Sequence, residues 1–210
     1  MIFMAGCLAL KHNATSTAEP RELLIIYTGN LLAELKPCGC SKEEDQGGIE
    51  RRMQYLKDTR KEHPHLLLVD TGDHFKEPTR QGKLKAETLL IATEQMQYDA
   101  VALGDRDLVY GSDFLKHRAQ IPWIAGNLTI DHFEPAQSRI KTFTNGLKVG
   151  ILAVADPGLF YDHIGLNIND PKSAALKHIT RMRDTEKPDL IVLLTHAKRE
   201  TALDYLDLSG

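Results

Sequence analysis

The feature that most constrains the fold is an alternation of short apolar runs with longer, more polar segments along the 210-residue chain. The apolar runs have the length of buried strands and lie at 23–28, 66–70, 100–103, 122–125 and 189–194. The segments expected to be helical lie at 49–60, 84–96, 112–119 and 171–185, the last with Asp170 as its N-cap. Asn145-Gly146, between 140–143 and 148–155, is typical of a hairpin turn. This pattern predicts an α/β domain built on a mixed sheet.

Polar residues that could bind a metal ion or a substrate follow the predicted strands. In open α/β sheets such residues gather at the carboxyl ends of the strands. The residues at these positions are Asn30, Asp73, Asp105, Asn127 and His196. Oxygen ligands with one imidazole suit Mn, Fe, Zn or Mg, and a pair of such ions can activate water against a phosphoester. Any one of these residues could equally cap a turn, but their ordered recurrence favours a metal site.

Four blocks of sequence carry a resemblance to a known family. They are Asp70-Thr71-Gly72-Asp73, Gly104-Asp105-Arg106-Asp107, Ala125-Gly126-Asn127 and Leu194-Thr195-His196. In this order they resemble the calcineurin-like metallophosphoesterases, and among these the 5′-nucleotidase branch, over roughly 23–208. The resemblance implies a four-layer αββα sandwich with two mixed sheets. It also implies hydrolysis of phosphomonoesters and nucleotides at a centre of two divalent metal ions.

The resemblance assigns metal ligands position by position. Asp73 matches the aspartate that bridges the two metal ions, and Asp105 and His196 match further ligands. Asn30 and Leu32 stand where the family has Asp-x-His. An asparagine offers an uncharged carbonyl oxygen and a leucine cannot ligate. The expected centre is therefore degenerate, with Mn, Zn, Fe or Mg at one or both positions.

Three further positions are assigned to catalysis and substrate binding by the same resemblance. Arg106 replaces the catalytic histidine, and Asp107 matches the acidic partner of that histidine. Because an arginine cannot exchange a proton near neutral pH, Arg106 is expected to hold the phosphate of the substrate. A surface ion pair of Arg106 with Asp107 is the structural alternative. Asn127 is expected at the substrate, with a strand-end cap as its alternative.

The loop Leu35-Lys36-Pro37-Cys38-Gly39-Cys40 is a second candidate site. The thiolates of Cys38 and Cys40 could supply the missing metal ligands, bind a softer metal, or form a redox pair or a local disulfide. This loop, followed by Gly47-Gly48 and an arginine-rich helix, is similar to a bacterial subgroup of the phosphoesterase-like proteins. That subgroup has no assigned substrate.

The two ends of the chain suggest a leader and a truncated domain. Residues 1–20 are expected to be a leader or tether, and 21–210 the folded domain. Met1 to Cys7 resembles the end of a bacterial lipoprotein signal, in which Cys7 would carry lipid and anchor an exported, periplasmic or membrane-attached protein. The charged start of such a signal is missing, so chance is the alternative. The family's Gly-His-x-His block does not occur before Gly210, and the domain is therefore expected to be truncated at its C-terminus.

Charge and composition exclude several classes of protein. A formal net charge of −3 gives no electrostatic basis for binding a nucleic acid polymer. No apolar run reaches the roughly 20 residues of a membrane helix, and three cysteines are too few for a disulfide scaffold. The sequence specifies no oligomeric state.

Three functional hypotheses are compatible with these observations. The leading one is metal-dependent hydrolysis of a small phosphate ester, with nucleotides among the candidates. The second is a non-catalytic metal- or ligand-binding descendant of the fold that uses the Cys38 and Cys40 loop. The third, a thiol-metal or electron-transfer accessory protein, rests on the two cysteines alone.

Overall fold

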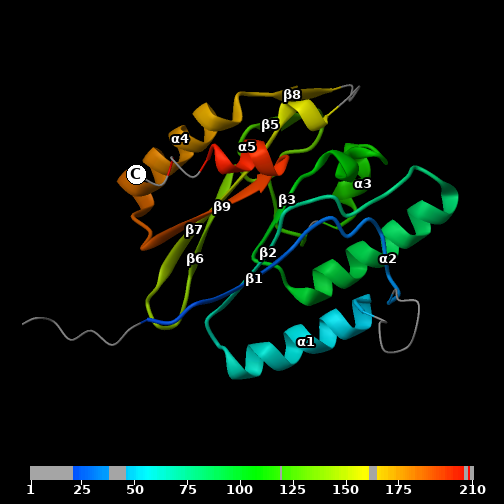
Figure 1. Cartoon of the computed structure of the whole chain (residues 1–210), viewed down its shortest axis with the longest axis horizontal. Helices are drawn as coiled ribbons and strands as arrows, with labels where there is room; N and C mark the ends of the chain where they lie inside the picture. The colour runs from blue at the N-terminus through cyan, green and yellow to red at the C-terminus, as the bar shows by residue number, and fades with distance from the viewer. Residues whose placement is uncertain (1–20, 38–45, 119, 161–164, 206–207, 209–210) are drawn as a thin grey trace, which may run out of the picture.

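The computed structural model describes residues 21–37, 46–118, 120–160, 165–205 and 208. Within these ranges, two main β-sheets pack together with helices on the outer side of each (Figure 1). The predicted leader at 1–20 with Cys7, and the pair Cys38 and Cys40, lie outside the described residues. No helix in the described ranges is long and apolar enough to cross a membrane.

The first sheet is parallel. Its strands occur in the order β1 (Leu24–Thr28), β2 (Leu66–Asp70), β3 (Ala100–Ala102) and β4 (Trp123–Ile124). Helix α1 (Ile49–Glu62) connects β1 to β2, helix α2 (Arg80–Met96) connects β2 to β3, and the two helices pack together. Because the strands are parallel, their carboxyl ends meet at one edge of the sheet, and the turns that follow them lie close together.

The second sheet is mixed. Strand β7 (Lys148–Ala155) pairs antiparallel with β6 (Ser138–Thr142) and parallel with β9 (Leu190–His196). The predicted hairpin turn joins β6 to β7, and the side chain of Asn145 accepts a hydrogen bond from the N–H of Leu147 at 3.0 Å. The hairpin prediction is therefore confirmed.

Helix α4 (Pro171–Arg181) begins where the sequence predicts. Oδ1 of Asp170 accepts a hydrogen bond from the N–H of Ser173 at 2.8 Å, which is the contact of an N-cap. The π-helical segment η3 (Met182–Glu186) continues the helix to one residue beyond the predicted end at 185. Pro171 occupies the first turn, where its missing N–H leaves no intrahelical bond unmade.

Two helices differ in extent from their predicted ranges. Helix α2 begins at Arg80 rather than at residue 84, because the Thr79 side chain caps it and accepts a hydrogen bond from the N–H of Gly82 at 3.0 Å. Helix α3 (Ser112–Lys116) ends before residue 119. The elements that were not predicted are too short to show periodicity: η1 (Asp105–Leu108), β5 (Leu128–Ile130), η2 (Pro157–Leu159), β8 (Leu166–Ile168) and α5 (Arg199–Leu203).

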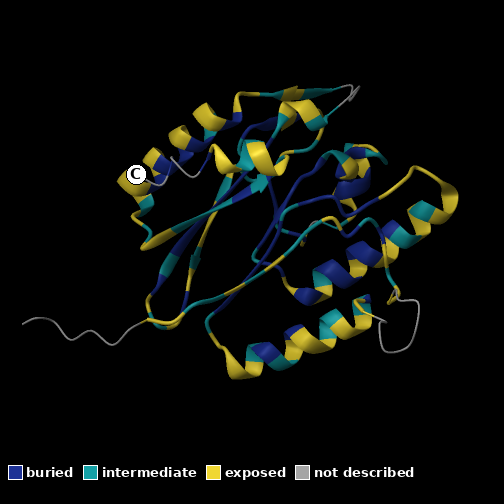
Figure 2. Ribbon diagram, in the orientation of Figure 1, coloured by how far each residue is buried: buried dark blue, intermediate teal, exposed yellow. Residues whose placement is uncertain are grey.

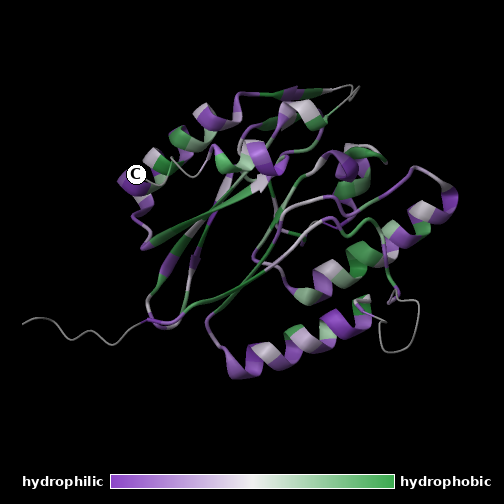
Figure 3. Ribbon diagram, viewed as in Figure 1, coloured by the Kyte–Doolittle hydropathy of each residue, from purple (hydrophilic) through white to green (hydrophobic). Residues whose placement is uncertain are grey.

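Three hydrophobic cores separate four layers. On β2, Leu68 packs in the core that includes α1 and α2, while Leu67 packs in the core between the sheets. On β7, Ile151 lies between the sheets and Leu152 packs in the core that includes α4. Figure 2 shows buried strands between helices whose outer sides are exposed, and Figure 3 shows the hydrophobic strands. The predicted αββα sandwich is thus confirmed, although the first sheet is parallel within the described residues.

Candidate metal centre

The turns after β2 and β3 and the end of β9 bring three predicted metal ligands together. Nε2 of His196 lies 3.1 Å from Oδ1 of Asp105 and 3.5 Å from Oδ1 of Asp73. One ligand atom from each residue lies within 4.8 Å of the other two. Among the His, Cys, Asp and Glu residues that the structure describes, no other group of three has this geometry. We refer to Asp73, Asp105 and His196 as the triad.

The backbone holds His196 in the orientation that a metal ligand requires. Nδ1 of His196 lies 3.1 Å from the carbonyl oxygen of Thr71, so we assign a proton to Nδ1, which donates it to that carbonyl. Nε2 then faces the carboxylates of Asp73 and Asp105 as the ligand atom. The ring of Phe160 packs edge-on against the imidazole, with 6.1 Å between the ring centroids. A carbonyl that fixes the ring in this way is usual behind metal-ligating histidines.

Two glycines allow the acidic turns to touch. A Cβ atom at Gly72, whose φ is 97°, would lie 2.6 Å from the backbone nitrogen of Gly104. A Cβ atom at Gly104 would overlap Oδ1 of Asp73 and lie 2.6 Å from Cε1 of His196. Asp73 itself has a φ of 64°, in the left-handed region that aspartate tolerates better than most residues. The close approach of the ligands therefore depends on glycine at both positions.

Asp73 has an unusual proton affinity. Burial raises the pKa of Asp73 to about 6, and the carboxylates of Asp107 and Asp105 act in the same direction. His196 and the N–H of Arg106, which donates to Oδ1 of Asp73 at 3.0 Å, act against the shift. A divalent cation between the carboxylates would offset both burial and repulsion. Two carboxylate oxygens and one imidazole nitrogen fit Mn, Fe or Zn, and less specifically Mg.

Asp107 forms no ion pair with Arg106, so the structural alternative given for these two residues is wrong. Its side chain is fully buried and faces the turn after β2. Oδ2 accepts hydrogen bonds from the N–H groups of Asp73 at 3.0 Å and Gly104 at 2.8 Å, and Oδ1 accepts one from the N–H of His74 at 2.8 Å. The carboxylate therefore positions backbone groups of the turns after β2 and β3. A catalytic role for Asp107 stays a prediction.

His74 is a buried histidine between two carboxylates. Its Nδ1 lies 3.0 Å from Oδ1 of Asp107 and its Nε2 lies 3.6 Å from Oδ1 of Asp70, with all three side chains fully buried. Burial disfavours the charged imidazole, but the charges of Asp70 and Asp107 outweigh it and raise the pKa of His74 to about 9. Burial likewise disfavours the Asp107 carboxylate, yet the charge and hydrogen bond of His74 hold the pKa of Asp107 below its usual range.

Arg106 lies at the rim of the triad. Half of its side chain is exposed, and its Nε lies 3.5 Å from Oδ2 of Asp105. Its backbone N–H is committed to Asp73, which anchors the residue next to the candidate ligands. The guanidinium therefore lies where a phosphate bound at the triad would need a counter-charge.

Asn127 is engaged with the backbone rather than with the triad. It is 1% exposed, and its Nδ2 donates hydrogen bonds to the carbonyls of Ala155 at 2.8 Å and Asn169 at 3.0 Å. Its Oδ1 accepts a hydrogen bond from the N–H of Ala155 at 2.9 Å. The amide joins the end of β7 to the chain before α4. These bonds support the strand-end alternative, and a substrate contact by Asn127 stays a prediction.

The turn after β1 contains no charged ligand. The N–H of Asn30 donates to the carbonyl of Gly72 at 2.9 Å, and the N–H of Leu32 donates to the carbonyl of Asp73 at 3.0 Å. This turn therefore docks on the turn that contains Asp73. Leu32 presents an apolar side chain there, and the exposed Asn30 presents a neutral one. Asn30 remains a proposed ligand.

Asp70 and His74, which lie in the buried cluster with Asp107, were not among the predicted site residues. Oδ1 of Asp70 accepts a hydrogen bond from the N–H of Gly72 at 2.7 Å, and Oδ2 accepts one from the hydroxyl of Thr28. The Thr28 hydroxyl also lies 2.9 Å from the hydroxyl of Tyr98. A signal was present in the sequence, because Asp70 ends an apolar strand of five buried residues. A carboxylate in such a position needs partners.

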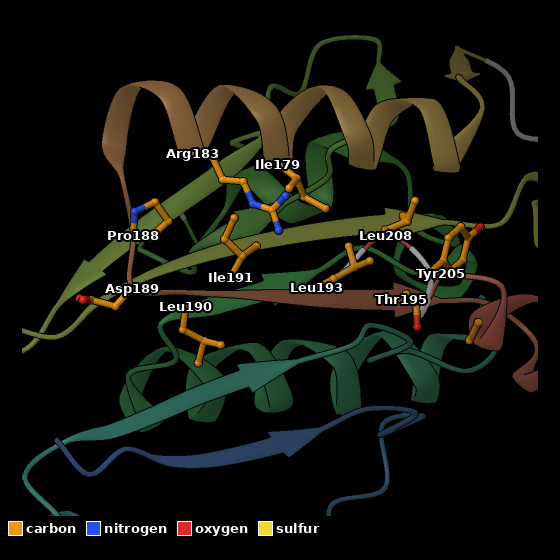
Figure 4. Close-up of a pocket in the computed structure, with 11 residues that line it drawn as sticks. Ile179, Arg183, Pro188, Asp189, Leu190, Ile191, Leu193, Thr195, Tyr205 and Leu208 are labelled. Carbon is orange, nitrogen blue, oxygen red and sulfur yellow. The ribbon is translucent and has the colours of Figure 1, made fainter. Parts of the chain in front are cut away.

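A groove of about 520 Å³ lies beside β9 and contains none of the triad (Figure 4). Its lining includes Ile179 of α4, Arg183 of η3 and Leu193 of β9, together with Tyr205 and Leu208. The lining is mostly apolar, in contrast to the carboxylates and imidazole of the triad. The groove therefore offers no ligand set for the predicted metal ions.

The chain is similar in sequence to proteins named as 5′-nucleotidases and as a nucleotide phosphoesterase. No protein-family model matches the chain. The chain is 27% identical to the snake venom 5′-nucleotidase of Crotalus adamanteus over 117 residues, which cover 51% of this chain and 20% of that protein. It is 26% identical to the trifunctional nucleotide phosphoesterase protein YfkN of Bacillus subtilis over 218 residues, which cover 88% of this chain and 15% of that protein.

The fold shows the same likeness. A 5′-nucleotidase precursor from Thermus thermophilus matches 87% of this chain with a TM-score of 0.74 and 22% sequence identity. The match covers 38% of that protein, so the chain spans well under half the length of each of these relatives. The resemblance to the 5′-nucleotidase branch of the calcineurin-like metallophosphoesterases, inferred from the strand-end motifs, is thus confirmed in both sequence and fold.

Proposed function

We propose that the protein binds a divalent metal ion through Asp73, Asp105 and His196 and hydrolyses a small phosphate ester. The observation that carries this proposal is the convergence of three ligand atoms within 4.8 Å at the strand ends. Relatives named as 5′-nucleotidases and as a nucleotide phosphoesterase support nucleotides as the first substrate class to test. Because the chain spans only part of these relatives, their activities are proposals for this protein.

The metal ion, the triad and Arg106 have different roles in the proposed reaction. A bound divalent ion supplies Lewis-acid stabilisation of a phosphoryl oxygen and lowers the pKa of a water molecule. Asp73 and Asp105 provide the negative charge that holds the ion, and His196 provides a nitrogen ligand that the Thr71 carbonyl orients. The guanidinium of Arg106 can donate parallel hydrogen bonds to the phosphate. Because an arginine side chain cannot serve as a general acid near neutral pH, we assign protonation of the leaving group to water.

A second candidate function is binding without hydrolysis. Leu32 and Arg106 favour it, because each stands where the resemblance implies a histidine. In this case the protein would bind metal or ligand through the triad, with Cys38 and Cys40 as further thiolate ligands. Export of the protein, to the periplasm or to a membrane through lipid on Cys7, is a separate proposal that fits either function.

Metal content and phosphatase activity of the purified protein separate the two candidates. We expect Mn²⁺ or Zn²⁺ to bind and to stimulate hydrolysis of p-nitrophenyl phosphate and of nucleoside 5′-monophosphates. Asp73→Asn should lose both properties, because asparagine tolerates the left-handed backbone but lacks the charge. Asp113→Asn is the matched control, since it removes an exposed carboxylate on α3.

Each outcome of this experiment has a defined meaning. Metal binding without hydrolysis would support the second candidate in its metal-binding form. A wild-type protein that binds no metal would refute the first candidate and the metal-binding form of the second. The double variant Cys38→Ser/Cys40→Ser tests the thiolates separately. Full metal content in that variant would assign the metal to the triad.

A further inference from the structure

His74 is a fully buried imidazole one residue from a candidate ligand, and the proposed reaction gives it no role. We infer that His74, bracketed by Asp70 and Asp107, is a positioning residue that holds the backbone of Asp73 in its ligating conformation. This inference rests on the proposed metal site. It adds a residue that contacts neither metal nor substrate but determines how well the triad is assembled.

Asp107 acts as a clamp that holds the turns after β2 and β3 together. Its carboxylate accepts hydrogen bonds from the N–H groups of Asp73, His74 and Gly104 at 2.8–3.0 Å. The first two belong to the turn after β2 and the third to the turn after β3. Because Asp105 follows Gly104 directly, one carboxylate sets the distance between two of the three candidate ligands.

His74 supports the carboxylate of Asp107 in this clamp. Its Nδ1–H donates to Oδ1 of Asp107 at 3.0 Å, which limits rotation of the carboxylate. Its Nε2 faces Asp70 at 3.6 Å and has no hydrogen-bond partner among the described residues. Asp70 is in turn bonded to the N–H of Gly72 and to the hydroxyl of Thr28. The imidazole therefore connects Asp70, at the end of β2, with Asp107 of η1, whose carboxylate holds the backbone of Asp73.

Removal of the imidazole is expected to destabilise the turn that contains Asp73. Gly72 and Asp73 have φ values of 97° and 64°, so the turn holds a backbone conformation that relaxes unless contacts maintain it. Without His74, the fully buried carboxylate of Asp107 loses a hydrogen-bond donor, and the imidazole that separates it from Asp70 is gone. A buried polar group left without its partner is unfavourable. Trp123 packs edge-on against the imidazole, with 5.2 Å between the ring centroids, which limits other positions for the ring.

The test compares two buried histidines. His74→Leu removes the proposed support, and His178→Leu is the matched control. His178 is 4% exposed, lies on α4 and bonds through Nε2 to the carbonyl of Gly126 at 3.0 Å. Both variants are studied at a temperature at which far-UV circular dichroism shows them folded. The measurements are amide hydrogen exchange at Asp73 and Gly104 by NMR, and Mn²⁺ affinity by calorimetric titration.

We expect His74→Leu to weaken Mn²⁺ binding about 10-fold or more, as for other residues that orient ligands. Exchange at Asp73 and Gly104 should accelerate by a similar factor, while His178→Leu leaves both quantities unchanged. Unchanged exchange and affinity in folded His74→Leu would overturn the inference. So would an equal change in the control.

Two further arms keep the test decisive. If His74→Leu does not fold, His74→Gln replaces it, because glutamine keeps an N–H donor that can reach Asp107. Because a glutamine amide has donors on its nitrogen only, it cannot present donors to Asp107 and Asp70 on two sides as the imidazole does. This variant should therefore bind Mn²⁺ more weakly than the wild type, and full wild-type affinity and exchange would contradict the inference. If the wild-type protein binds no Mn²⁺, the proposed function fails, but the exchange measurement still tests the support of Asp73.

Discussion

The turns after β1 and β2 lie side by side and follow similar backbone paths, yet they differ in chemistry. Both contain left-handed residues, with φ values of 51° at Asn30, 47° at Leu32 and 64° at Asp73. Backbone hydrogen bonds from Asn30 to Gly72 and from Leu32 to Asp73 join them. The turn after β2 presents a carboxylate to the triad, whereas the turn after β1 presents an amide and an aliphatic side chain.

The two turns differ in the contacts that support their backbones. Behind Asp73 lies the fully buried set of Asp70, His74 and Asp107, whose hydrogen bonds hold the backbone from within. The turn after β1 takes its shape from backbone hydrogen bonds to its neighbour, which depend on no particular side chain. The backbone shape of such a turn therefore does not depend on a charged ligand. In this structure, the turn that presents a carboxylate also has buried side-chain support, and the turn after β1 is held by backbone hydrogen bonds.

The largest effect is expected from Gly104→Ala, which breaks the turn that bears the ligands. The new Cβ would overlap Oδ1 of Asp73 and crowd His196, so a carboxylate or a strand end must move. We expect a loss of stability of about 4 kcal/mol, because the overlap involves buried groups. Urea denaturation measures this loss, and calorimetric titration should show no metal binding.

Gly158→Ala is the control for that prediction. A Cβ atom there would approach no closer than 3.2 Å to Oδ1 of the half-buried Asp156, the N-cap of η2. It should leave both stability and metal binding near wild-type values. A Gly104→Ala protein with wild-type metal affinity would show that the two turns do not depend on close contact.

The next effect is expected from Asp107→Asn, which keeps the size of the clamp and removes its charge. An asparagine has one acceptor oxygen for the backbone N–H groups that two oxygens now share, and it leaves His74 without one of its carboxylates. We expect a destabilisation of about 3 kcal/mol, as for a broken buried ion pair. Asp113→Asn, which alters an exposed carboxylate, should change the urea midpoint little.

A smaller effect should come from repairing the turn after β1. The double variant Asn30→Asp/Leu32→His restores the ligand types that the resemblance implies, and histidine tolerates the left-handed backbone of position 32 better than leucine. We expect the number of bound metal ions per chain to rise, or the affinity of the existing site to increase about 10-fold. Elemental analysis and calorimetric titration measure these quantities. An unchanged stoichiometry and affinity would mean that the turn is not part of the metal site.

The smallest effect concerns pH and the second buried histidine. Burial lowers the pKa of His178, the hydrogen bond to the Gly126 carbonyl acts in the opposite direction, and the charges of Arg181 and Lys177 add to the lowering. At pH values just below about 6.5, the ordinary pKa of histidine, residue His178 therefore binds a proton more readily in the unfolded chain than in the folded protein. Stability should fall as the pH drops through this range. The fall between pH 7.5 and pH 5, measured by urea denaturation, should be smaller in His178→Gln. An equal fall in both proteins would contradict the prediction.

Much of the architecture could be predicted from the sequence, because strands and helices leave periodic patterns. The five apolar runs all form strands, and Asp170 and Asn145 occupy the cap and the turn that their types indicate. The start of α2 was predicted too late, because its first turn is polar and the signal is a single Thr79 cap. The pair β5 and β8 was missed because three-residue strands have no measurable period.

The candidate ligands could be predicted in the same way, but their supporting residues could not. Asp73, Asp105 and His196 are recognisable by their place after strands. The alternative of an ion pair between Asp107 and Arg106 is wrong, because adjacency in sequence does not reveal that one side chain faces inward and the other outward. The sequence also does not show that the amide of Asn127 is bonded to Ala155 and Asn169 from distant parts of the chain.

The α/β layering, the order of the strand-end motifs and the types of atoms offered to a metal ion are all specified by the sequence. These properties are local, since they follow from side-chain type and spacing. Which of those atoms meet depends on tertiary structure, because His196 reaches Asp73 and Asp105 only when β9 packs beside the first sheet. The position of His74 between two carboxylates has the same origin, because burial and long-range packing create that arrangement.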